Sequence, residues 1–221
     1  MASANRIVAL AFAVSLSSIS ATLLAHPSQT TGPFDSTAPE NSTDGLVADG
    51  VAHLRVSVCD HTHAEAAAIG LGEAIAAAVY QRTGVAIDWT NGCQYDAPSD
   101  FHINPLPQRM TPRALRALNV FGFAAAGQSV ANVMWERIDA AAINHRIASG
   151  HLLGFVIAHE LGHLLLPPKA HRWSSVMQRD IDFRAAAVHD LWFNREQAAL
   201  ILRKVQSIAD HRRDSMSVAS N

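Results

Sequence analysis

The chain has 221 residues, of which 49% are hydrophobic and 16% charged, and its formal charge is −2 with histidine neutral. This near-neutral balance argues against a protein that binds nucleic acid through its phosphates. The hydrophobic content is typical of a chain that buries a core, and the length predicts one globular domain. Twelve histidines are present, and histidine is the commonest metal ligand.

Residues 1–25 have the pattern of a signal peptide. Arg6 precedes an uncharged, mostly apolar stretch that ends in small residues, which is the order that export signals require. The stretch is short for a membrane span and contains several serines, so we favour cleavage after Ala25 over an uncleaved membrane anchor. We therefore expect a secreted or periplasmic protein with no stable membrane association after cleavage.

The rest of the chain divides into a linker, a domain and a tail. Residues 26–50 are rich in Pro, Gly, Ser and Thr and hold few apolar residues, which predicts a flexible linker or pro-region. Residues 51–212 carry the hydrophobic patterns of a folded domain. Residues 213–221 are polar, which predicts a disordered tail.

Strands and one helix alternate in the first half of the domain. The pattern Thr62-x-x-Glu65 is a capping box, which predicts the start of a helix that runs to Thr83. Gly84 then stands where a C-cap glycine belongs. Apolar and β-branched residues predict strands at 53–59, 85–90, 100–104 and 130–138.

The second half of the domain is mainly helical. The segment HLLGFVIAHELGHLLL, residues 151–166, is apolar around nearly its whole circumference, which predicts a buried helix. Pro167 and Pro168 end this helix, and an amphipathic helix over 195–208 closes the domain. Together these elements predict an α+β fold with a buried central helix and a C-terminal helix.

The buried helix contains the sequence His159-Glu160-Leu161-Gly162-His163. Two histidines four residues apart project from one helix face and can bind one ion together. A buried apolar helix accommodates two imidazoles and a carboxylate only if each finds a partner. We therefore interpret His159 and His163 as zinc ligands and Glu160 as the general base that takes a proton from a zinc-activated water. The alternative is two core histidines hydrogen-bonded to the backbone, with a structural glutamate.

A hydrolytic zinc site takes three protein ligands and leaves one coordination position open. His171 is the favoured third ligand, because it follows the proline break, where the chain can turn back beneath the metal. Glu196 on the last predicted helix is the alternative. Asp180 and Asp182 lie close enough in sequence to orient a ligand histidine.

Cys59 and Cys93 are the only cysteines. An exported protein matures where disulfides persist, so this pair favours one bridge over two unpaired thiols or a zinc-ligand cysteine. His61 and His63 flank Thr62 at the predicted helix start, where exposed histidines are favoured over a second metal site.

These residues resemble the zincin metallopeptidases, and within them the metzincins, whose pattern is HExxHxxGxxH followed by a methionine turn. Here Leu166 stands at the glycine position, Lys169 stands at the third-ligand position, and His171 comes two residues later. Met177 resembles the methionine-turn residue. The run from Ala158 to Met177 is also similar to little-characterised secreted bacterial zinc proteases.

The resemblance implies a metzincin-like mixed sheet with a buried active-site helix. It also implies that the strand predicted over 130–138 is the edge strand that pairs with an extended peptide substrate. On this basis we expect a secreted, monomeric zinc metalloendopeptidase that binds one Zn²⁺ per chain, cleaves peptide or protein substrates and binds no nucleic acid. The alternatives are a secreted zinc-binding pseudoenzyme and a hydrolase of non-peptide amide bonds at the same site.

Overall fold

The computed structural model describes residues 51–62, 64–93, 99–116, 118, 120–124, 128–168, 171 and 175–219. The predicted signal peptide and linker, over 1–50, lie outside the described residues, and so does His63. Within the ranges that are described, no helix is long and apolar enough to cross a membrane.

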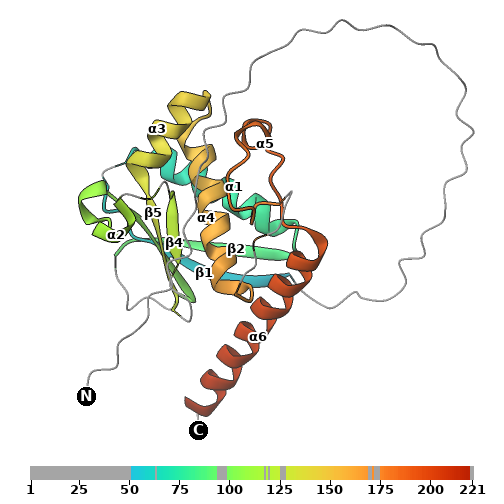
Figure 1. The fold of residues 1–221 in the computed structure, drawn as a ribbon. Coiled ribbons are helices and arrows are strands. Elements are labelled where there is room, and N and C mark those ends of the chain that lie inside the picture. The colour runs from blue at the N-terminus through green and yellow to red at the C-terminus, as the bar shows by residue number, and fades with distance from the viewer. Residues whose placement is uncertain are drawn as a thin grey trace, which may run out of the picture. The chain divides into compact units, whose positions relative to one another are not determined.

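Five described strands form one sheet in the spatial order β2-β1-β3-β5-β4 (Figure 1). Strands β2, β1, β3 and β5 are parallel to one another, whereas β4 is antiparallel to β5 and lies at an edge. The sheet is therefore mixed, as the resemblance implied. The strands are β1 (Ala52–Val58), β2 (Val85–Asn91), β3 (Phe101–Leu106), β4 (Gly122–Ala124) and β5 (Val130–Met134).

The strand predicted over 130–138 is too long, and its predicted edge position is wrong. β5 ends at Met134, and helix α3 (Trp135–His145) begins at the next residue. The fully buried residues Ile138 and Ala142 are four positions apart and so share one helix face, which explains why this segment is helical. β5 lies between β3 and β4, so among the described strands β4 is the edge strand on that side of the sheet.

Several of the described helices pack against the sheet (Figure 1). Helix α4 (Ser149–Leu165) packs against β4 and β5 and lies alongside α1 (Ala66–Gln81) and α3. Most of its residues are fully buried, which confirms the predicted central helix. The α+β fold class is thus confirmed. The remaining described helices are η1 (Gln108–Met110), α2 (Arg113–Arg116), α5 (Phe183–Ala187) and α6 (Arg195–Ala219).

The start of α1 differs from the prediction. Thr62 does not cap the helix, because its hydroxyl oxygen accepts from the N–H of Ala64 at 3.0 Å, before the helix begins, and its own N–H donates to Asp60 Oδ1 at 2.8 Å. Glu65 takes the N-cap position without a side-chain hydrogen bond. The helix ends at Gln81, and Gly84 adopts a φ of 81° before β2, a conformation that favours glycine.

Helix α6 is longer than predicted. It continues to Ala219, so the disordered tail predicted for 213–221 is wrong for residues 213–219. Arg212 on this helix pairs with Asp100 at 2.6 Å, and Asp100 also pairs with Arg55 of β1 at 3.3 Å. Because the Asp100 side chain is only 8% exposed, water and salt screen these ion pairs less than they screen surface pairs. The cluster therefore ties the polar half of α6 to the sheet.

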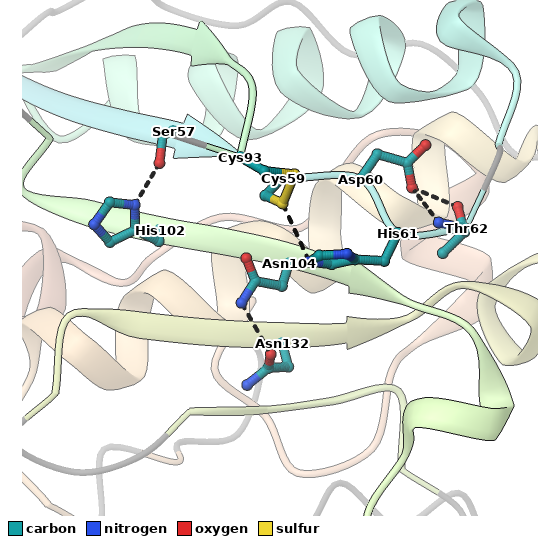
Figure 2. The surroundings of a disulfide bond; sticks show 9 residues. All are labelled: Ser57, Cys59, Asp60, His61, Thr62, Cys93, His102, Asn104 and Asn132. Carbon is teal, nitrogen blue, oxygen red and sulfur yellow. Dashed lines mark hydrogen bonds between the residues drawn. A yellow bond between two sulfur atoms is a disulfide. The ribbon is translucent and has the colours of Figure 1, made fainter. Parts of the chain in front are cut away.

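A disulfide joins Cys59 and Cys93, which confirms the predicted bridge (Figure 2). Cys59 follows the last residue of β1, and Cys93 lies just beyond the end of β2. The bridge thus connects the carboxyl ends of two parallel neighbouring strands. Gly92, with a φ of 141°, lets the chain turn toward Cys59, and its N–H donates to the carbonyl oxygen of Val58 at 2.9 Å.

Helices α1 and α4 approach each other closely because glycine lies at their contact. A Cβ added at Gly154 of α4 would stand 2.5 Å from Cβ of Ile75 and 2.7 Å from the carbonyl oxygen of Gly72, both on α1. These are backbone or branched groups that cannot move aside without shifting the helix. The contact therefore sets the position of α4 relative to α1.

We expect Gly154→Ala to destabilise the protein by about 1–3 kcal/mol, because the added methyl group overpacks the helix contact. Gly70→Ala is the matched control, since Gly70 lies on exposed α1 surface with no atom within 4 Å of an added Cβ. That control should be neutral or more stable by up to about 1 kcal/mol through helix propensity. Urea unfolding monitored by tryptophan fluorescence measures both. Equal stabilities of the two variants would contradict this packing account.

Candidate metal centre

Three histidines converge beside helix α4. His159 and His163 lie one turn apart on the helix, and their Nε2 atoms are 3.0 Å apart. His171 reaches the same place from the segment after α4, with its ring centre 4.8 Å from that of His163 and 5.4 Å from that of His159. One nitrogen of each ring lies within 4.8 Å of the others, so the set could hold one metal ion.

The backbone determines how the ring of His159 is oriented. Its Nδ1 lies 2.8 Å from the carbonyl oxygen of Val176, which can only accept a hydrogen bond. Nδ1 therefore carries the proton in the neutral ring, and the lone pair is on Nε2, which faces His163. A ligand histidine whose second nitrogen donates to a carbonyl is the usual arrangement at protein metal sites.

All three imidazoles are held in the neutral form that binds metals. Burial lowers the pKa of His159 well below its ordinary value, and the nearby His163 lowers it further. Burial, followed by the influence of His171, lowers the pKa of His163 to about 4. The pKa of His171 is also lowered, first by burial and then by the positive charge of Arg179. Protons therefore compete weakly for these nitrogens at neutral pH.

Glu160 is the most deeply buried carboxylate near the cluster. Only 1% of its surface is exposed, and burial raises its pKa well above the ordinary value. Its Oε2 atom is buried and has no hydrogen-bond partner among the described residues. A buried polar atom without a partner is costly. A carboxylate held in this way beside three neutral imidazoles fits a site that takes a cation and a water molecule.

Apolar residues surround Glu160. A narrow apolar hollow beside His159 and Glu160 is lined by Phe121, Val156 and Ile181. Edge strand β4 also passes close to this carboxylate, because a Cβ added at Gly122 would lie 2.6 Å from Glu160 Oε1. Glycine at this position thus allows the edge strand to approach the carboxylate.

A tight turn at residues 175–178 lies against α4, the helix that carries His159 and His163 and is called the motif helix below. The N–H of Met177 donates to the hydroxyl of Ser175, and the N–H of Val176 donates to the carbonyl oxygen of Trp192 at 2.8 Å. Met177 is fully buried, and a Cβ added at Gly162 of the motif would collide with its sulfur. The turn predicted around Met177 therefore packs directly against the helix that carries the histidines.

Arg137 of α3 supports the segment that leads into β4. Its guanidinium donates to four backbone carbonyl oxygens, including those of Val120 at 3.1 Å and Arg116 at 2.8 Å. These carbonyls lie in the segment 115–120, just before Phe121 and the edge strand. One side chain thus fixes the chain that approaches Glu160.

The other residues that the sequence analysis considered as ligands or as groups that orient a ligand lie outside the histidine cluster. Glu196 is exposed in the first turn of α6 and does not belong to the histidine cluster. Asp182 caps α5, where it accepts hydrogen bonds from the N–H groups of Arg184 and Ala185, and Asp180 is exposed. The group that orients His159 is therefore a backbone carbonyl. His61 is half-buried beside Cys59 and is not an exposed helix-turn residue.

Several supporting groups could not be found from sequence reasoning. They are the Val176 carbonyl, Arg137 and the hydroxyl of Tyr80, which donates to the carbonyl oxygen of Ala158 beside His159 at 3.2 Å. No local motif marks any of them. The one signal was the buried character of the motif helix, which requires that its polar groups find partners.

Comparisons with known proteins give one structural likeness to report. The solved structure of archaemetzincin from Methanopyrus kandleri is 15% identical to this chain, with a TM-score of 0.49, and the match covers 73% of this chain and 99% of that one. No protein-family model matches the chain, and a search of curated proteins found no match.

In protein freed of metal by chelation, we expect Glu160→Gln to raise stability, and to raise it more at about pH 8 than at about pH 5. The unfolded chain releases the Glu160 proton near pH 4.5, whereas the folded chain keeps it to higher pH. The stability from this residue is thus fully present below that pH and is lost as pH rises through the folded-state pKa. A glutamine side chain does not titrate, so the Glu160→Gln variant does not lose this stability as the pH rises.

Urea unfolding of the native protein and of Glu160→Gln, each at the two pH values, measures the difference in their free energies of unfolding. Glu196→Gln replaces an exposed carboxylate in the same way and is the matched control. A Glu160→Gln gain that shrinks at the higher pH would contradict the buried-carboxylate account.

Proposed function

We propose that this chain is an exported zinc-dependent peptidase in which His159, His163 and His171 bind the metal. The observation that carries this proposal is the convergence of three neutral imidazoles beside a buried carboxylate. Three histidine ligands with one open position are typical of catalytic zinc. When bound, the ion would supply a Lewis acid that polarises a carbonyl group and lowers the pKa of water.

Glu160 is assigned as the general base. Its partnerless, buried Oε2 atom can accept a proton from a water molecule that attacks a substrate carbonyl, and it can later return that proton to the leaving amine. The apolar residues Phe121, Val156 and Ile181 beside it exclude bulk water. A raised pKa suits this role, because the carboxylate then takes up a proton more readily near neutral pH.

A peptide substrate is favoured by edge strand β4. Among the described strands, β4 pairs with β5 on one side only, so its other edge can add an extended peptide. Gly122 brings this edge next to Glu160, so a peptide paired with β4 would pass the base. Arg137 holds the segment before β4 in place and is assigned as a positioning residue.

Export is supported by the disulfide. Bridges between Cys residues persist in secreted and periplasmic proteins and are rare where thiols are kept reduced. The predicted signal peptide over 1–25 is proposed on its sequence pattern alone.

We expect the purified native protein to contain about one zinc per chain and His171→Ala to lose most of it, because removing one of three ligands weakens the site. Elemental analysis after dialysis measures the metal. His145→Ala removes an exposed histidine of α3 and should retain the native content. Full zinc retention by His171→Ala would remove His171 from the ligand set.

We expect Glu160→Gln to reduce peptide cleavage by about a hundredfold or more while zinc stays bound, because only the proton acceptor is lost. Cleavage of a fluorogenic peptide library measures the rate, and elemental analysis provides the metal control. Cleavage at the native rate would overturn the role of Glu160. A native protein that binds zinc but cleaves no peptide would favour the pseudoenzyme or a hydrolase of other amide bonds.

A further inference from the structure

A second cluster of metal-binding side chains lies at the carboxyl end of strand β1. It consists of Cys59, Cys93 and His61, which share no residue with the three-histidine cluster (Figure 2). His61 Nε2 lies 3.1 Å from Cys59 Sγ. The two sulfur atoms and one imidazole nitrogen all lie within 4.8 Å of one another. Cys59 is buried, His61 is half-buried and Cys93 is exposed.

The backbone holds this cluster in place independently of the sulfur bond. The N–H of Cys59 donates to the carbonyl oxygen of Ile103 at 2.9 Å, and the N–H of His61 donates to that of Pro105 at 3.1 Å. Both acceptors belong to β3, so the segment after β1 continues along this strand. Main-chain pairing with β3 therefore directs His61 at Cys59, and this pairing does not run through the sulfur bond.

Small molecules can reach the cluster from solvent. A hollow of about 410 Å³ is lined by Cys93, Asp60, Asn91 and Gly92, among others. Exposed Cys93 is the sulfur that a reductant attacks. Asp60, whose Oδ1 accepts both hydrogen bonds from Thr62, adds a negative charge at the rim that favours an entering cation.

We propose that Cys59, Cys93 and His61 form a redox-gated site for a thiophilic divalent cation such as Zn²⁺ or Cd²⁺. In the oxidised protein the sulfurs are bonded to each other and offer no thiolate. A small dithiol breaks the bond, giving two electrons and two protons to the protein and becoming a disulfide itself. The cation then displaces the two thiol protons and is bound by two thiolates and the imidazole, with water as a fourth ligand.

The ligand types fit this class of ion. Two thiolates and one imidazole with an open position are known as a zinc ligand set, and soft sulfur ligands select such metals over magnesium or calcium. The inference does not depend on the proposed peptidase function, because it involves neither α4 nor the turn around Met177.

Cadmium titration of the full chain tests the proposal. The protein is stripped of metal, reduced with a dithiol and desalted without oxygen, and the ultraviolet absorption of cadmium–thiolate bonds is recorded. The three-histidine cluster contains no sulfur, so this absorption reports the second site alone. We expect saturation at about one cadmium per chain for reduced protein, and no absorption for the oxidised protein or for Cys93→Ser.

Two histidine variants decide whether His61 is a ligand. We expect His61→Ala to weaken cadmium binding by about tenfold or more, whereas His53→Ala, which removes an exposed histidine of β1, leaves it unchanged. Absence of the thiolate band in reduced native protein would overturn the proposal. Equal affinities of the two variants would overturn it too, because an unfolded reduced chain binds cadmium through its thiols without help from His61.

Discussion

His159 donates its Nδ1 proton to the carbonyl oxygen of Val176, and this hydrogen bond joins the motif helix to the turn at residues 175–178. It places the proton on one nitrogen and leaves the other directed at His163. The same turn carries Met177, which packs against Gly162 of the motif. A single contact thus determines the tautomer of one histidine and the position of the segment beneath the helix.

The burial of α4 makes this contact necessary and also gives the site its chemistry. Polar groups in an apolar helix must be paired, because leaving them unpaired in a medium of low polarity is costly. His159 meets this requirement through Val176, whereas Glu160 Oε2 has no partner among the described residues. The same burial lowers the pKa of the imidazoles and raises that of the carboxylate. The environment therefore keeps the imidazoles of His159 and His163 neutral and makes the Glu160 carboxylate ready to accept a proton.

The sequence predicted best the elements whose signal is local and strongly periodic. The buried helix and strands β1, β2 and β3 are where the apolar patterns placed them. The strand predicted over 130–138 failed, because alternation in the first residues gives way to helical spacing from Trp135 onward. The predicted tail failed because α6 continues through it, with Arg213 paired to Asp210 one turn earlier, while Arg212 just before it is anchored by the remote Asp100. The capping box failed because the Thr62 hydroxyl oxygen accepts from Ala64, before the helix, and Asp60 takes the Thr62 N–H that Glu65 would need.

What the sequence by itself determined is the pair His159 and His163 with Glu160 between them, because one helical turn brings residues four apart to the same face. Only the tertiary structure decided that His171 joins this pair while Glu196 does not, and that Val176 orients His159. It also decided that β4 and not β5 is the edge strand, and that His61 lies against the Cys59–Cys93 bridge. Such contacts depend on where loops and strands pack against each other, which the spacing of residues along one helix does not encode.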